Sequence, residues 1–356
     1  MVGFAQKMAE RPVNPFVGAC ALGDLEEVKR RLDAGEDVNQ IDTNDDEIPE
    51  EEVITNFPAF VDAARESTTL NTAGKAGIHV AMETWNEKLL RLLDARGANL
   101  YLNCQVGAGE IPLLIAIRNG FMAGVKFLIE EKHMLDNWPS HYAGPEALLT
   151  TAMSCVEEKD GLALLKYFIE EHNLDWRKAR SSTNLDLLRM AELCGMPEDE
   201  RGMGYTEYLL DLGWDVNEPQ ESVNRIPIIA AGPDGEVMDM NPLAEMTRQK
   251  DLYCAMPLNR VAYAGDLDRV RLYLAHGANP LLPNHNDQNA YDAVQAGLEV
   301  QKDWLQKYED GKVRPESLNK QKARVSRLEQ ISDILFDAMQ AKFGKSMAPS
   351  PTGPGG

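Results

Sequence analysis

The sequence predicts an all-α solenoid of stacked helix pairs, and two observations predict it. One template starts at Pro15 and again at Pro257, and in both copies a glycine follows the proline after eight residues and a second glycine after twelve more. Between the glycines, apolar residues recur at helical spacing. The template therefore describes two short helices, each ended by a glycine. One such pair cannot bury its own apolar stripe, so neighbouring copies must stack.

The first copy, residues 14–39, shows how the side chains specify the unit. Asn14 can accept hydrogen bonds from the free N–H groups of the first turn, and Pro15 suits the first helical position. Gly23 ends this helix, because a residue with positive φ costs least without a Cβ. The second helix has an apolar stripe of Leu25, Val28 and Leu32, and Gly35 ends it.

Both strong copies resemble the ankyrin repeat, including its closing loop: Gly35-Glu36-Asp37-Val38-Asn39 in one, Gly277-Ala278-Asn279 in the other. Weaker copies lie at residues 78–99, 111–132, 147–169 and 185–217, and a half-repeat starts at residue 290. Trp85 replaces the middle glycine of its copy and Lys132 the last. The resemblance implies about six to seven degenerate repeats that recognise a protein through finger loops and the concave face of the first helices.

The predicted domain organisation has four parts. They are an N-terminal extension (1–13), a repeat array (14–299) with insertions at 40–57, 195–204 and 218–254, a helical insertion with a C-terminal capping helix (300–343), and a disordered tail (344–356). Within the third part, residues 302–327 carry eight basic side chains against four acidic ones. This basic stretch is expected either to fold back on the acidic body or to contact an external partner.

Composition limits the classes of partner and the cellular location. The net charge is −21, from 57 acidic against 36 basic residues, so direct binding to nucleic acid is not expected. No apolar run approaches the length of a membrane span, and residues 1–11 lack the apolar core of a secretory signal. The five cysteines form no Cys-x-x-Cys pair, which is typical of reduced thiols. We expect a monomer in the cytoplasm or the nucleus.

An acidic run follows the first repeat, where ankyrin proteins project a finger toward their ligands. Residues 42–52 contain no lysine or arginine. One interpretation is an acidic lip that attracts a basic segment of a partner protein. The alternative is a solvated insertion that only aids solubility. The candidate contact residues of this run are Asp45, Asp46, Glu47 and Glu50.

Aromatic and methionine residues in other loops are further candidates for partner contact. Tryptophan and tyrosine give a large contact area at low entropic cost, and methionine adapts to irregular surfaces. The alternatives are packing between mismatched repeats and an ordered lid. These candidates are Trp138, His141, Tyr142 and Trp176, with Asp234, Met238 and Met240 in the longest insertion.

The sequence carries no motif that assigns catalysis. Gly107-Ala108-Gly109 lacks the third glycine and the preceding strand of a dinucleotide-binding loop. His79 occupies the turn position at which an ankyrin histidine ties neighbouring turns by a hydrogen bond. No catalytic residue, cofactor or metal ligand is assigned. Three functions stay open: a non-catalytic adaptor that binds a basic or mixed-charge segment, a small-molecule or catalytic pocket built from the insertions, and an inhibitor or effector that blocks a target protein.

Overall fold

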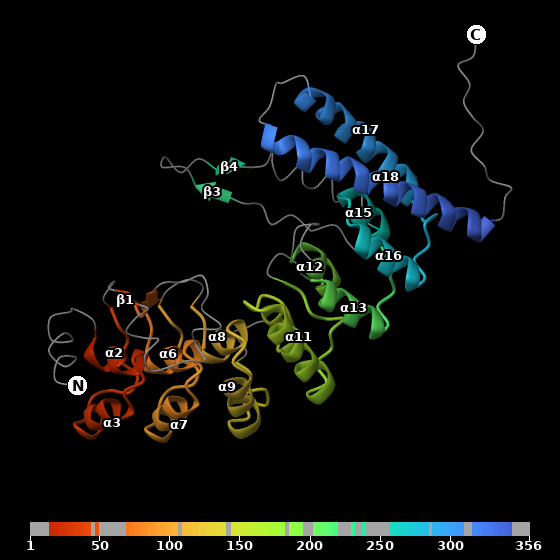
Figure 1. Cartoon of the computed structure of the whole chain (residues 1–356). Coiled ribbons are helices and arrows are strands. Elements are labelled where there is room, and N and C mark those ends of the chain that lie inside the picture. The colour runs from red at the N-terminus through yellow and green to blue at the C-terminus, as the bar shows by residue number, and fades with distance from the viewer. Residues whose placement is uncertain are drawn as a thin grey trace, which may run out of the picture. The chain divides into compact units, whose positions relative to one another are not determined.

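The computed structural model consists mainly of short paired helices (Figure 1). It describes residues 14–43, 47–49, 69–105, 109–139, 144–181, 185–194, 202–219, 229–231, 237–239, 256–284, 287–309 and 315–343. The chain divides into two compact units, residues 1–179 and 180–356, and each is described by itself.

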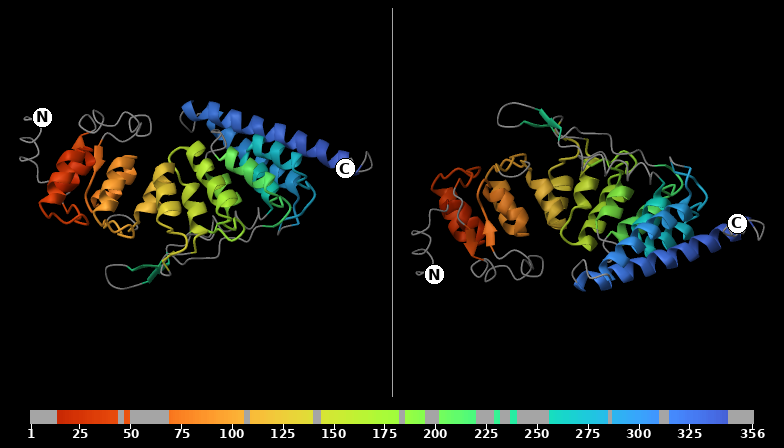
Figure 2. Two further views of the ribbon diagram at one scale, coloured as in Figure 1. Left: turned by 90° about the horizontal axis from the view of Figure 1, so that it is seen from below. Right: turned by 90° about the horizontal axis from the view of Figure 1, so that it is seen from above.

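In the first unit, consecutive helix pairs stack in sequence order (Figure 2). Neighbouring first helices pack on one another, from α2 to α6 to α8 to α10, and each second helix covers its own first helix. The pairs are α2 (Pro15–Ala21) with α3 (Leu25–Asp33), α6 (Gly77–Glu83) with α7 (Glu87–Ala95), α8 (Pro112–Arg118) with α9 (Met122–Lys126) and η1 (Phe127–Glu131), and α10 (Ala147–Ala152) with α11 (Glu158–Lys166) and η2 (Tyr167–Glu171).

The second unit repeats the arrangement and ends in two longer helices. Its described helices are α12 (Leu187–Leu193), α13 (Met203–Asp211), α15 (Pro257–Ala264), α16 (Leu267–Ala275), α17 (Ala290–Glu309) and α18 (Pro315–Phe343). The start of α17 packs on α15 as a seventh first helix would, and α18 runs back along α17 and reaches α16 (Figure 1). Most of residues 302–327 is helical, since it forms the end of α17 and the start of α18.

The predicted all-α repeat architecture is confirmed. It carries four short strands among the described residues: β1 lies in the predicted insertion 40–57, β2 lies after it, and β3 and β4 lie in the predicted insertion 218–254. Strand β1 (Glu47–Pro49) pairs antiparallel with β2 (Thr69–Asn71), and Glu47 lies opposite Asn71. Strand β3 (Ile229–Ala231) pairs in the same way with β4 (Val237–Asp239). Each pair of strands is a two-stranded ribbon, so neither replaces the helical core.

Helix ends follow the sequence template. The Asn14 side chain accepts hydrogen bonds from the backbone N–H of Phe16 at 3.0 Å and of Val17 at 3.1 Å, as an N-cap should. Gly23 and Gly265, which end the first helices of the two strong copies, have φ of 65° and 83°. Trp85 has φ 52° at the position where these copies have glycine, which confirms its place in the template.

The third and fourth repeats each contain a π-helical turn. In the third repeat, thirteen residues separate Gly120 from His133, where the strong copies have twelve. The backbone N–H of Lys132 donates to the carbonyl of Phe127 at 3.1 Å, which is an i to i+5 bond. The second helix absorbs the extra residue as η1 and then ends with His133 at φ 53°. The second helix of the fourth repeat also ends in a π-helical turn, η2, which Asn173 follows at φ 56°.

Replacing His133 by glycine is expected to stabilise the first unit. A side chain at positive φ costs about 1–2 kcal/mol, and glycine returns part of that through its freer unfolded chain. We therefore expect His133→Gly to raise the free energy of unfolding by about 0.5–1 kcal/mol in urea denaturation. Asn173→Gly is the matched comparison and should change little, because asparagine tolerates this conformation. Destabilisation by both changes would contradict a strained backbone at these helix ends.

The loops between repeats are tied by side-chain hydrogen bonds. His79 is fully buried; its Nδ1 accepts from the backbone N–H of Ala76 at 3.0 Å and its Nε2 lies 2.7 Å from the carbonyl oxygen of Leu102. The predicted structural role of His79 is confirmed, and burial lowers the pKa of its ring. In the closing loops, Asn39 accepts from the backbone N–H of Asn99 at 2.7 Å, and Asn217 forms the same 2.7 Å bond with Asn279.

Candidate partner-binding surface

The first finger is the loop between α3 and α6, and a buried carboxylate holds it to the first helix pair. Asp42 is fully buried; it accepts from the Thr72 hydroxyl at 2.5 Å and from the backbone N–H of Asn14 at 3.2 Å. Its own backbone N–H donates to the carbonyl of Lys75 at 2.9 Å. Asp42 therefore belongs to the support of the finger, although the sequence placed it in one acidic run with residues 45–52.

Above this support the finger continues as the β1–β2 ribbon and contacts the next finger. Ile41 bridges to Ala76 at the base, and β1 pairs with β2 further along the finger. The backbone N–H of Gln105, in the second finger, donates to the carbonyl of Gly74 at 2.7 Å. A backbone hydrogen bond therefore joins the two fingers.

Four of the predicted contact residues lie among the described residues, on separate elements. Glu47 starts β1 and Met238 is the middle residue of β4. Trp138 is half-buried in the loop after η1. Trp176 is only 7% exposed, and the Arg177 guanidinium lies over its ring at 3.8 Å from the centroid. The remaining predicted contact residues lie outside the described part of the chain: Asp45, Asp46, Glu50, His141, Tyr142, Asp234 and Met240.

Sequence reasoning missed an exposed pair at the turns of the third and fourth repeats. Val156 is 56% exposed, and its backbone N–H donates to the carbonyl of Arg118 at 3.1 Å. The Arg118 side chain is half exposed and pairs with Glu110. A signal was available, since the strong copies have Gly-Asp at this turn whereas the fourth repeat has the apolar Val156. An exposed apolar side chain beside an arginine suits protein contact.

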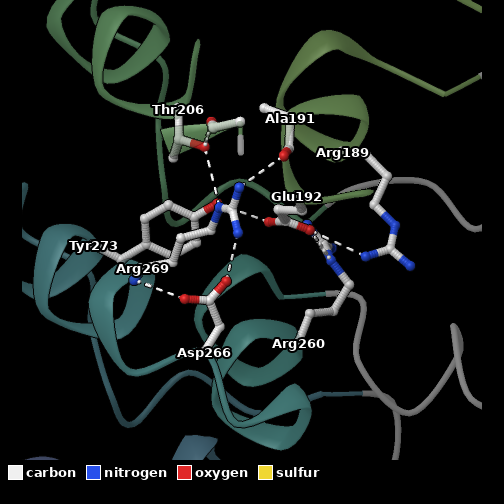
Figure 3. Close-up of polar contacts among 9 residues, drawn as sticks. Arg189, Ala191, Glu192, Thr206, Arg260, Asp266, Arg269 and Tyr273 are labelled. Atoms are coloured by element: carbon white, nitrogen blue, oxygen red, sulfur yellow. Dashed lines mark hydrogen bonds and ion pairs between the residues drawn. The ribbon is translucent and has the colours of Figure 1, made fainter. Parts of the chain in front are cut away.

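The densest group of charges in the second unit is buried (Figure 3). The Arg260 guanidinium donates two hydrogen bonds to Glu192, at 2.8 and 2.9 Å, and the Tyr273 hydroxyl donates a third at 2.7 Å. Arg189 adds a fourth at 3.1 Å. Burial alone would raise the pKa of Glu192, but the charges of Arg260 and Arg189 and the hydrogen bonds outweigh it and lower the pKa.

A third arginine, Arg269, extends this cluster toward α13. Arg269 donates to Asp266 at 2.5 Å, to the carbonyl of Ala191 at 2.8 Å and to the Thr206 hydroxyl at 3.2 Å (Figure 3). The cluster joins α12, α13, α15 and α16. The oxygens of Glu192 are occupied by donors from the chain itself, so the arrangement serves packing and offers no acid or base to a substrate.

No other chemistry emerges from the part of the chain that the structure describes. Within it, no group of three or more His, Cys, Asp or Glu side chains could hold a metal ion. None of the described helices has the length and apolar character that a membrane crossing requires. The cysteines described, Cys20, Cys104, Cys155 and Cys194, form no disulfide with one another.

Comparisons with known proteins leave the family open. No family model and no curated protein matches the sequence. Among solved structures, the chain is similar to the human ASB11 ankyrin repeat domain, with 16% identity and a TM-score of 0.43 over 79% of this chain and 91% of that one. The ankyrin-like fold rests on the helix pairs, the glycines at their ends and the loop hydrogen bonds of this chain.

Proposed function

We propose that this protein is a non-catalytic adaptor that binds a basic or mixed-charge segment of a partner protein. The main support for this proposal is the structure and charge of the first finger. It is a ribbon anchored by the buried Asp42, and it carries an acidic run without a basic residue between positions 42 and 52. A fixed support under a cluster of like charges lowers the cost of ordering the contact surface and raises the rate of encounter with a cation-rich segment.

Apolar contacts would add to this electrostatic attraction. Val156 beside Arg118, and Trp138 in the loop after η1, supply apolar surface in the same unit as the acidic run. Surface charges alone give weak and salt-sensitive contacts, whereas a tryptophan supplies area that excludes water. We propose that the protein acts as a monomer in the cytoplasm or the nucleus.

The test is a titration with a defined basic probe. We would measure fluorescence anisotropy of a fluorescein-labelled peptide with alternating lysine, arginine and leucine, with the full chain, at low and at high salt. Four substitutions in the acidic run, Asp45→Asn, Asp46→Asn, Glu47→Gln and Glu50→Gln together, are expected to weaken binding about tenfold or more, with the difference shrinking in high salt.

The control removes the same number of charges elsewhere on the first unit. It carries Gln or Asn at four exposed acids that adjoin neither Trp138 nor Val156: Glu26, Asp33, Glu87 and Glu171. Binding that falls equally in both variants would show a general charge effect and overturn the proposed finger contact. Absence of binding to the wild-type chain at low salt would overturn the proposal as a whole.

A further inference from the structure

His79 lies between the bases of the first two fingers. Its ring is fully buried, and its two nitrogen atoms contact different segments. Nδ1 accepts from the backbone N–H of Ala76, at the base of the first finger, where Ala76 also bridges to Ile41. Nε2 lies 2.7 Å from the carbonyl oxygen of Leu102, which leads into the second finger, the loop between α7 and α8. One side chain thus joins the two finger bases.

These two contacts require a neutral ring with its proton on Nε2. A backbone N–H only donates, so Nδ1 of His79 must keep a free lone pair. A carbonyl oxygen only accepts, so Nε2 must carry the hydrogen. A second proton would come from solvent and bind at Nδ1. It would place two N–H groups against each other and leave the N–H of the fully buried Ala76 without its acceptor.

The surroundings of the ring oppose a second proton. Burial has the largest effect on the pKa of the His79 ring and lowers it; the hydrogen bond to Leu102 raises it less, and the Lys75 charge lowers it again. On α2, which packs against α6, the only ionisable group is the Cys20 thiol, and burial raises the pKa of that thiol. The charged groups on the finger bases, α6, α7, α8 and the loop after α7 are Asp42, which Thr72 and Asn14 hold, the exposed Lys88, and the ion pairs Lys75–Glu83, Glu110–Arg118, Glu87–Arg91, Asp94–Lys132 and Arg96–Asp33.

The second unit has a counterpart of His79 that cannot take up a proton. Six positions before the residue at the turn between the paired helices, the first, second, third and sixth copies have Val17, His79, Leu114 and Asn259. Asn259 is also buried, and its Nδ2 donates to the carbonyl of Gln288, in the loop after α16, at 3.1 Å. Because an amide side chain does not titrate, His79 is the residue among these four whose contacts depend on pH.

We propose that His79 is an acid-sensitive latch: a proton taken up at Nδ1 breaks the hydrogen bond from Ala76 and loosens the bases of the first two fingers, while the second unit keeps its loop contact through Asn259. Under the proposed function, this loosening would weaken partner binding in acid. The latch itself depends only on contacts within the chain, so its test needs no partner.

The direction of the pH effect follows from proton linkage. The folded first unit resists protonation of His79, so the open form binds more protons below the ordinary histidine pKa of 6.5. The first unit therefore loses stability as the pH falls through 6.5 toward the lowered pKa of the folded ring. Glu83 acts in the opposite direction, because burial raises the pKa of its carboxyl and acid then favours the folded form.

The test is hydrogen exchange of the full chain followed by mass spectrometry, with correction for the intrinsic exchange rate at each pH. Between about pH 7.5 and 5.5, we expect the protection of residues 72–80 and 99–105 to fall about threefold to tenfold in wild type, because one proton separates the closed and open forms. Protection of residues 256–264, around Asn259, should change less than about twofold.

Two substitutions of histidine by asparagine form a matched pair. His79→Asn removes the titrating ring and introduces the residue type found at position 259, so protection of the finger bases should then vary with pH by less than about twofold. His133→Asn removes an exposed histidine at a position of positive φ, which asparagine tolerates, and should keep the wild-type response.

Three results would overturn the latch. They are constant protection of the finger bases in wild type across this pH range, an equal loss of protection in both units, and an acid response that survives in His79→Asn. If His79→Asn does not fold, the comparison of the two units in wild type decides, because it needs no substitution. None of these measurements uses the basic peptide, so failure of the latch is distinguishable from failure of the proposed finger contact.

Discussion

Truncating Glu192 to alanine is expected to lower the free energy of unfolding of the second unit by about 3–5 kcal/mol, because it leaves the buried Arg260 without its counter-charge. The Tyr273 hydroxyl and Arg189 lose their acceptor in the same step. Urea denaturation followed by circular dichroism measures the loss. Replacing the pair together, with Glu192→Leu and Arg260→Met, should recover most of it, because two apolar side chains of similar size fill the space without a stranded charge.

The lowered pKa of the Glu192 carboxylate predicts how the stability of the second unit depends on pH. The pKa of Glu192 is lowered in the folded chain, so its contribution is complete above its ordinary pKa of 4.5 and is lost as the pH falls below that value. The alanine variant lacks this dependence. A variant as stable as wild type at pH 7, or one that loses stability below pH 4.5 as steeply as wild type, would contradict a stabilising role for this cluster.

A methyl group at Gly202 is expected to cost about 2–5 kcal/mol, from a strained backbone and from overlap with its neighbours. Gly202 has φ 79°, and a Cβ there would overlap the carbonyl oxygen of Ala191 and lie 2.8 Å from the Nη2 of Arg269. That carbonyl is an acceptor of Arg269, so Gly202→Ala would disturb the cluster as well as the turn.

The substitution Gly213→Ala separates the cost of backbone strain from the cost of steric overlap. Gly213 has φ 88°, but a Cβ there would meet nothing within 4 Å, so only the backbone cost of about 1–2 kcal/mol applies. We expect Gly202→Ala to be clearly the more destabilising of the two in urea denaturation. Equal effects would show that the approach to Ala191 contributes nothing.

The repeat architecture could be predicted because its signals are local. Gly23, Gly35, Gly265 and Gly277 each mark a helix end that needs positive φ, and their spacing fixes the lengths of the helices between them. The π-helical turns could not be predicted in the same way. The third repeat has one extra residue, so the sequence pattern suggests that Lys132 replaces the terminal glycine. In the structure the residue with positive φ at this helix end is His133.

The buried charges could not be predicted from the sequence, because their partners are distant along the chain. Glu192 and Arg260 are separated by 68 positions, and each resembles an ordinary surface charge in a chain rich in charges. The role of Asp42 could not be predicted from the sequence either, although its partners are closer along the chain. It begins an acidic run in the sequence, but its contacts with Asn14 and Thr72 place it under the finger.

Part of the chemistry of the candidate partner-binding surface could be predicted from the sequence. The sequence indicated an acidic run after the first repeat and a basic stretch near the C-terminus, and most of the basic stretch lies in helices α17 and α18. The exposed Val156 beside Arg118 needed the turn geometry of two neighbouring repeats.

The measurement that tests the proposed function most directly is hydrogen exchange of the full chain with and without the basic peptide, followed by mass spectrometry. We predict slower exchange on binding in the first finger, residues 45–52, and in the adjoining finger around Gln105, with little change in α3, α7 and α13. Protection confined to those second helices, or to α17 and α18, would contradict recognition of a basic segment by the finger loops.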